Sequence, residues 1–352
     1  MTEKNWWLDA TAELSEPTRQ QAQAHQNQLT KPQGSLGRLE NIAIELAAMQ
    51  NTVKPQIHTP HMLIFAGDHG IVAQGVSAFP QSVTIAMLAN FVNGGAAVAT
   101  LCKKQGIVLN VINCGTANAC EHLANIIHQP IMAGTHDFSQ QAAMSTEQTL
   151  QALNLGKVQV ERIYNNGCDF LMLGEMGIGN TSAASCLSAL LLEREVSGLT
   201  GPGTGVEGTA LTHKKNILSA SVARAKPLAN STLAILEQVG GLEIAAITGA
   251  YIRASQLGLP CFVDGFITSA AALLAVRLNP AVRDWLLFSH QSAECGHSAV
   301  LTALHAEPLL NLGMRLGEGS GAAVAYATLQ QALTIHNNMA TFAQAAVDNK
   351  DL

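Results

Sequence analysis

Charged side chains are scarce in this chain of 352 residues, where Asp, Glu, Lys and Arg together make up only 12%. The formal net charge is −6 and no long Lys/Arg cluster occurs, so the basic patch typical of nucleic-acid-binding proteins is missing. With 48% hydrophobic residues, the composition also lies outside that of disordered chains. We therefore expect a globular protein that does not bind nucleic acid and holds any anionic ligand in a local site.

Aromatic residues are also scarce, at 4%, so the core must be built from Ala, Leu, Ile and Val. The seven cysteines are scattered, odd in number and never arranged as C-x-x-C. This pattern is typical of small buried apolar residues in a reducing compartment, and we expect a cytoplasmic protein.

Long hydrophobic runs are absent as well. The first ten residues, MTEKNWWLDA, contain no apolar signal core. The most apolar later stretch, residues 267–276, is far shorter than a membrane span. We therefore expect no membrane association.

What the chain does contain is a series of short apolar runs that alternate with Ala-rich helical stretches. The runs lack the alternation of a half-exposed strand, which indicates parallel strands buried on both faces and joined by crossover helices. Each run ends in polar residues, and in a parallel α/β sheet ligands bind at the carboxyl ends of the strands. The predicted strands are residues 62–66, 107–112, 170–173, 261–263 and 285–288.

Both ends of the chain have helical patterns. Apolar residues recur near a period of 3.6 within residues 11–50, interrupted by a turn at Lys31–Ser35. We predict an α/β domain over residues 55–320 and a smaller helical domain made of residues 1–54 together with 321–352.

The segment GEMGIGNTS (174–182) follows a predicted strand and precedes a predicted helix. Its glycines bare backbone N–H groups that can hold an anion, and Asn180 or Thr181 can cap the helix. The glycine spacing is neither the dinucleotide fingerprint nor a P-loop. A tight turn without a ligand is the alternative interpretation.

A second glycine loop, GPGTG (201–205), is followed by Lys214 and Lys215. A lysine beside such a loop can neutralise a phosphate, although a mobile surface loop with solvated lysines would have the same sequence.

Two further segments carry polar clusters at strand ends. In GDHG, Asp68 and His69 could bind a metal, but no partner follows at zinc-type spacing, so a hydrogen-bonding pair is favoured. The segment SHQSAECGH (289–297) lacks a nucleophile motif, and we favour substrate positioning by its hydroxyl groups over nucleophilic catalysis.

The segment LGEGSGAA places Glu318 just before the last helical stretch. A helix N-terminus favours the charged carboxylate by about 0.3–1 kcal/mol. Burial acts in the opposite direction and raises a carboxyl pKa by up to about 3–5 units. In a closed site burial wins and leaves a base suited to neutral pH, whereas an ordinary acidic residue in a first helical turn is the alternative.

Taken in order, KPQGSLGRLE, DHG with GVSAFPQSVT, GEMGIGNTS, GLPCFVDGF, SHQSAE and MRLGEGSGAA resemble the nicotinate-nucleotide–dimethylbenzimidazole phosphoribosyltransferase family. The resemblance spans about residues 30–340. It implies a Rossmann-like parallel sheet with a small helical domain, a homodimer, no redox cofactor and no metal site. It also implies the substrates, namely nicotinate mononucleotide and a benzimidazole base.

The same resemblance assigns roles to residues. It makes Glu318 the general base and Glu175 a second catalytic group, either stabilising charge on the ribosyl carbon or moving a proton. It places donor phosphate at Gly177, Ile178, Gly179, Asn180, Thr181, Gly203 and Lys214, and adds Asp264, Ser292 and Leu316 as substrate-binding residues.

The region that binds the base departs from better-known members of the family, because Phe79 and Met87 replace smaller or polar residues. We expect 5,6-dimethylbenzimidazole as the acceptor, and a bulkier apolar pocket that shifts the preference to another benzimidazole, a purine or a phenolic acceptor is the alternative. A catalytically silent nucleotide-binding subunit is a further alternative, and a dehydrogenase is a weaker one because its fingerprint is missing.

Overall fold

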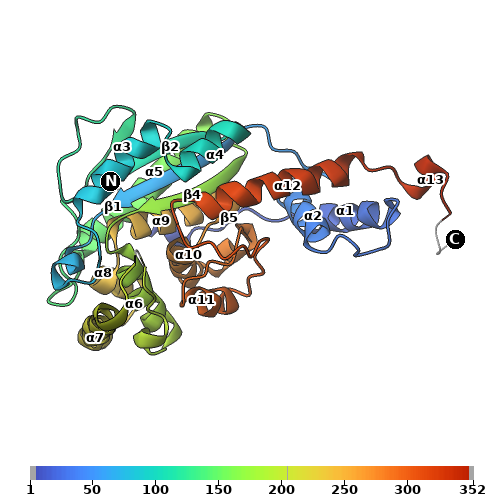
Figure 1. The fold of residues 1–352 in the computed structure, drawn as a ribbon. Coiled ribbons are helices and arrows are strands. Elements are labelled where there is room, and N and C mark those ends of the chain that lie inside the picture. Colours follow the sequence, from blue (N-terminus) through green and yellow to red (C-terminus); the bar gives the residue numbers. More distant parts are fainter. Residues whose placement is uncertain (1–4, 204, 349–352) are drawn as a thin grey trace.

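The computed structural model describes residues 5–203 and 205–348, and it contains one six-stranded parallel sheet flanked by helices (Figure 1). The strand order is β3-β2-β1-β4-β5-β6, the order of doubly wound dinucleotide-type sheets. The α/β class predicted from the sequence is therefore confirmed. The strands are β1 (Pro60–Gly67), β2 (Val108–Gly115), β3 (Ile126–His128), β4 (Phe170–Met176), β5 (Cys261–Val263) and β6 (Leu286–Phe288).

All five predicted apolar runs overlap a strand, and the sequence patterns missed only β3 among the described residues. This strand is three residues long, and two of them are only partly buried. It carries too little apolar sequence to stand out from a loop.

Residues along β1 alternate between two hydrophobic cores. Leu63 and Phe65 pack on one face, against α5, α9 and α10. Met62 and Ile64 pack on the other, against α2, α4 and α12. In Figure 1, α3 and α4 accordingly lie on the opposite side of the sheet from α9 and α10.

The helices are α1 (Glu16–Gln28), α2 (Arg38–Gln50), α3 (Ser82–Val92), α4 (Ala97–Gln105), α5 (Thr146–Asn165), α6 (Asn180–Leu192), α7 (Gly208–Ala225), α8 (Thr232–Val239), α9 (Leu242–Gln256), α10 (Phe266–Leu278), α11 (His297–Ala303), α12 (Ser320–Asn338) and α13 (Phe342–Ala345). Short 3-10 turns lie at Trp6–Leu8, Gly70–Gln74, Val196–Gly198, Lys226–Leu228 and Pro280–Trp285.

The two ends of the chain meet beside α12. Leu29 forms an antiparallel bridge with Thr341, and the His25 ring nitrogen Nε2 bonds the His336 carbonyl at 2.8 Å. Figure 1 shows α12 running from the sheet to α1 and α2. The helix thus contacts both predicted domains, and the boundary near residue 320 stays a prediction.

One helical segment of the described chain, Ser82–Gln105, is by length and composition apolar enough to cross a membrane. The expectation that no stretch reaches that length was therefore wrong. A single such segment is weak support for a membrane protein, because core helices pass the same test. Here the segment is two helices, α3 and α4, in which Leu88, Phe91 and Val98 are buried in the core.

Six of the seven cysteines are buried and all seven are free, as their scattered positions predict. Cys295 is the exposed exception.

Candidate active site

A cavity of about 660 Å³ lies at the carboxyl ends of β4, β5 and β6, with α3 as one wall. This volume is within the range of small-molecule sites. All residues that the sequence suggested for the site line this cavity, except Gly179 and Lys214. The polar ends of β4, β5 and β6 thus share one cavity, whereas Asp68 and His69 at the end of β1 do not line it.

The turn between β4 and α6 approaches the cavity with its backbone. A Cβ atom on Gly177 would overlap the Gly67 carbonyl, and Gly179 has a left-handed φ of 99°. Gly179 is the N-cap of α6 and no side chain caps the helix, so the prediction that Asn180 or Thr181 would do so is wrong. Asn180 instead donates its side-chain amide to Glu175.

Lys214 lies behind the edge formed by Thr181 and Gly203 and is only 2% exposed. Its ammonium group donates a hydrogen bond to Thr181 Oγ1 at 3.2 Å. Burial lowers the pKa of Lys214, which the negative charge of Glu294 partly opposes. The alternative of a solvated surface lysine is thus excluded for Lys214. Thr204, in the glycine loop 201–205, lies outside the described residues.

Glu175 is buried at the end of β4, where both carboxyl oxygens have partners. Oε1 accepts a hydrogen bond from the backbone N–H of Glu318 at 3.2 Å, and Oε2 accepts the amide of Asn180. Burial, and then the negative charges of Asp264, Glu243 and Glu318, raise the pKa of Glu175 to about 8. Its carboxyl group is therefore mostly protonated at neutral pH.

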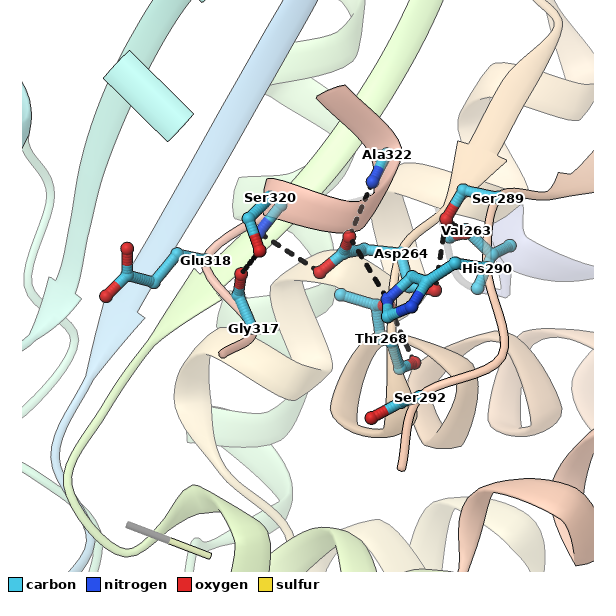
Figure 2. A network of polar contacts seen from close by, with 12 residues as sticks. Val263, Asp264, Thr268, Ser289, His290, Ser292, Gly317, Glu318, Ser320 and Ala322 are labelled. Atoms are coloured by element: carbon cyan, nitrogen blue, oxygen red, sulfur yellow. Dashed lines mark hydrogen bonds and ion pairs between the residues drawn. The ribbon is translucent and has the colours of Figure 1, made fainter. Parts of the chain in front are cut away.

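Glu318 precedes α12 and has a left-handed φ of 64°. Burial, assisted by the negative charge of Asp264, raises the pKa of Glu318 to about 7. Figure 2 shows the Glu318 side chain extending away from Asp264. Glu318 lines the cavity. As expected from the sequence, burial outweighs the helix end and leaves a carboxyl group that can take up a proton near neutral pH.

Asp264, at the end of β5, uses its carboxylate to hold the start of α12 (Figure 2). Its oxygens accept hydrogen bonds from the backbone N–H groups of Gly319 at 3.1 Å and Ala322 at 2.7 Å. His290 Nε2 lies 3.8 Å from the same carboxylate. These groups hold the Asp264 carboxylate in place, and because the residue also lines the cavity its substrate-binding role stays a prediction.

The hydroxyl groups of the segment after β6 differ in their contacts. Ser289 donates to the carbonyl of Val263 at 2.7 Å, which makes it a structural group, whereas Ser292 lines the cavity. His297 accepts a hydrogen bond from the Ser292 N–H at 2.8 Å, and burial lowers its pKa to about 3. A neutral, fully bonded His297 is not a base for a serine nucleophile, in agreement with the favoured interpretation.

Asp68 and His69, at the end of β1, form separate buried contacts, as favoured from the sequence. Asp68 accepts hydrogen bonds from Thr84 Oγ1 at 2.6 Å and the Ala117 N–H at 2.9 Å. His69 Nε2 lies 2.7 Å from Glu243 Oε1, with both side chains fully buried. In the described residues, no group of three or more His, Cys, Asp or Glu could hold a metal ion.

The wall toward α3 is apolar. Phe79, Val83 and Met87 line it together with Met176 from the end of β4. Phe79 is 47% exposed, so this part of the cavity opens toward solvent. Sequence patterns indicated Phe79 and Met87 but not Met176, although Met176 directly follows Glu175 in the glycine-rich segment.

Four polar residues of the cavity were also missed, namely Thr268, His290, Glu294 and Arg315. Arg315 reaches the Gly203 carbonyl at 3.4 Å, and Glu294 and His290 complete the polar side. Arg315 and Glu294 lie inside segments already singled out, but a lone charged residue gives no pattern of its own.

Comparisons with known proteins identify the family to which the chain belongs. A sequence family described as "Phosphoribosyltransferase" matches residues 11–347. A protein of Pseudomonas aeruginosa named nicotinate-nucleotide–dimethylbenzimidazole phosphoribosyltransferase is 49% identical over 345 residues, 98% of each chain. One of the same name from Ectopseudomonas mendocina is 51% identical and covers 97% of each. The crystal structure of CobT from Thermus thermophilus superimposes with a TM-score of 0.90 at 39% identity, covering 95% of this chain and 99% of that one.

Proposed function

The chain belongs to the phosphoribosyltransferase family, and from this membership we propose that it is a nicotinate-nucleotide–dimethylbenzimidazole phosphoribosyltransferase. It moves 5-phosphoribose from nicotinate mononucleotide to a lower-ligand base during assembly of the cobalamin nucleotide loop. The observation that carries the proposal is the similarity of about 50% identity over nearly the whole chain, and the cavity lined by Glu175 and Glu318 is consistent with it.

In the reaction, one ring nitrogen of the base attacks C1′ of the donor and forms a new glycosidic bond. The bond from C1′ to the pyridinium nitrogen breaks, and its electron pair leaves with nicotinate. The proton on the other nitrogen of the base passes to Glu318. Attack opposite the leaving group inverts C1′ and gives an α-ribazole 5′-phosphate.

Nicotinate is a good leaving group, so proton removal from the acceptor is the step that needs help from the protein. A positioned base contributes about 10²–10⁴-fold to such a step, and it works best when its pKa is near the operating pH. Glu318 meets that condition because its pKa is about 7.

The donor phosphate binds at the turn 177–181 and at Gly203. Backbone N–H groups of a glycine turn before a helix favour an anion there. Positive charge comes from Lys214, whose ammonium lies against Thr181, and from Arg315 beside Gly203.

The test is release of nicotinate from nicotinate mononucleotide when dimethylbenzimidazole is added to the purified protein. Glu318→Gln is expected to lower kcat/KM by about 10²–10⁴-fold with little change in folding. Wild-type activity in Glu318→Gln would remove Glu318 from the role of base. Tight nucleotide binding without turnover would instead indicate a catalytically silent subunit.

The apolar wall of Phe79, Met87 and Met176 supports a second candidate, the same transfer to a purine or phenolic acceptor. Ranking a panel of acceptors by kcat/KM decides between them. A clear preference for dimethylbenzimidazole over every other base would exclude this candidate.

We further propose that the enzyme is a cytoplasmic homodimer and needs neither a redox cofactor nor a metal. The apolar side chain of Ile85 on α3 supports an interface, because it is only partly buried and does not line the cavity.

A further inference from the structure

Glu318 lies in an unusual stretch of backbone. Gly317, Glu318 and Gly319 all have left-handed conformations, with φ of 80°, 64° and 80°. Glycine adopts this conformation freely, but a residue with a side chain does so at a cost in free energy. The surrounding structure must therefore hold Glu318 in place.

Two buried carboxyl groups accept hydrogen bonds from the backbone of this stretch and of the helix start. Glu175 accepts the backbone N–H of Glu318 at 3.2 Å. Asp264 accepts the next N–H, that of Gly319, at 3.1 Å, and its other oxygen accepts Ala322 at 2.7 Å (Figure 2). Glu175 is 5% exposed and Asp264 is 1% exposed, so water competes little for these bonds.

The backbone also packs directly on the sheet. A Cβ atom on Gly174 would lie 2.8 Å from the carbonyl group of Glu318, and one on Gly319 would lie 2.7 Å from Met62 Sδ. The stretch therefore rests directly on the backbone of β4 at Gly174 and on the Met62 side chain of β1.

We propose that Glu175 and Asp264 are positioning residues, which hold Glu318 in its left-handed conformation and so direct its carboxyl group at the acceptor. This inference rests on the proposed function, in which Glu318 takes the acceptor proton. The glycine-rich turn before α12, which could have bound an external anion, is occupied by the protein's own side chains.

A direct catalytic role for Glu175 makes a different prediction. If the charge of Glu175 acts on the ribosyl carbon, glutamine cannot replace it. If Glu175 instead serves as a hydrogen-bond acceptor for the Glu318 N–H, glutamine can replace it. The glutamine amide oxygen accepts the same hydrogen bond, and the Asn180 amide flips to present its oxygen to the new NH2 group. The protonated state of Glu175 near neutral pH agrees with the second case.

The experiment compares Glu175→Gln with Glu175→Ala in the full chain. We expect Glu175→Gln to keep kcat/KM within about threefold of wild type, and Glu175→Ala to lose on the order of 10²-fold, the effect of a misplaced catalytic group. Equal losses in the two variants would overturn the inference, as would full activity in both.

Hydrogen exchange gives a readout that does not depend on activity. In Glu175→Ala and Asp264→Ala, amides of the peptide spanning residues 316–323 are expected to exchange on the order of tenfold faster, the equivalent of one lost hydrogen bond. Unchanged exchange in this peptide would also overturn the inference.

Asp169→Ala is the matched control, because Asp169 likewise accepts two backbone N–H groups, from His58 and Thr59, just before β4. It is expected to leave exchange of residues 316–323 unchanged. Failure of the proposed function would look different, since the wild-type protein would then release no nicotinate whatever the exchange result. Failure of Glu318 as the base would leave Glu318→Gln fully active.

Discussion

The environment of Glu318 sets the pH at which its carboxyl group can act as a base. Its pKa is raised to about 7 by burial and by the negative charge of Asp264. We expect kcat/KM to fall as the pH drops through about 7, because Glu318 then holds a proton already. Replacing Asp264 with Asn removes the nearby negative charge and should lower the pKa of Glu318. The acid limb of the pH–rate profile should then move to lower pH.

Rate profiles of wild type and Asp264→Asn between pH 5 and 9 measure the shift. The position of the limb reports the charge effect, while its height reports any displacement of Glu318. An acid limb at the same pH in both proteins would contradict the electrostatic explanation.

Glu175 should make the protein less stable as the pH rises. Its folded-state pKa of about 8 exceeds the ordinary value of 4.5, so unfolding releases a proton between these two values. The stabilisation is complete below pH 4.5 and is lost as the pH rises through 8, by on the order of a few kcal/mol. Glu175→Gln should therefore raise Tm more at pH 9 than at pH 5. An equal change in Tm at both values would show that Glu175 does not titrate in this range.

At the scale of elements, a single hydroxyl group joins α3 to the turn before α6. Thr84 Oγ1 donates to Asp68 at 2.6 Å and accepts the backbone N–H of Ile178 at 3.2 Å. Because Thr84 is fully buried, Thr84→Val leaves both partners without this bond in nearly the same volume. The donor-side turn should shift, and we expect KM for nicotinate mononucleotide to rise about tenfold, while KM for the base changes less.

Thr84→Ser keeps the hydroxyl group and serves as the control, with both KM values expected to stay close to wild type. Steady-state kinetics with each substrate varied in turn provides the measurement. Equal effects on the two KM values would mean that Thr84 supports the cavity in general and not the donor turn.

Helices α5 and α9 pack so closely that their contact does not tolerate larger side chains. Gly156 on α5 faces the backbone of α9 so closely that a Cβ atom would overlap the Ala246 carbonyl. We expect Gly156→Ala to destabilise the protein by about 1–3 kcal/mol or more, because the two helices must move apart. Chemical denaturation measures this, and Gly198→Ala, with no atom within 4 Å of the added Cβ, is the control. Equal stability of the two variants would exclude tight packing at Gly156.

At the scale of the whole molecule, we expect a dimer in solution. Sedimentation velocity should give a mass twice the 37.0 kDa of one chain. Ile85→Lys would then favour the monomer, if α3 forms the interface, because a charge is poorly tolerated in an apolar contact. A wild-type monomer at micromolar concentration would contradict the dimer.

Much of the architecture follows from local sequence. Strands buried on both faces need continuous apolar runs, and the turns at their carboxyl ends need glycine, so both are visible in β1, β4 and β5. The location of the cavity followed as well, because parallel strands bring their ends to one edge. The proton-accepting environment of Glu318 was also predictable, since an apolar, closed setting raises a carboxyl pKa.

What could not be predicted depends on contacts between distant segments. That Asn180 bonds Glu175 instead of capping α6, or that Asp264 holds α12, is set by the register of one element on another. Lys214 was recognised beside the glycine loop, but nothing in α7 indicates that it is buried. Arg315 joins Gly203 across more than a hundred residues.

The length of α12 has a mechanical consequence. Its 19 residues, at about 1.5 Å each, make a rod of about 28 Å that begins two residues after Glu318 and ends beside α1 and α2. Pivoting such a rod by about two degrees moves one end by about 1 Å relative to the other, the scale on which catalytic placement matters. The packing of α1 and α2 on the C-terminal end of α12 therefore helps to set the position of Glu318. A binding partner or a fused tag at the C-terminus would therefore change kcat by tilting α12 and displacing Glu318. Comparing kcat of tagged and untagged enzyme would test this.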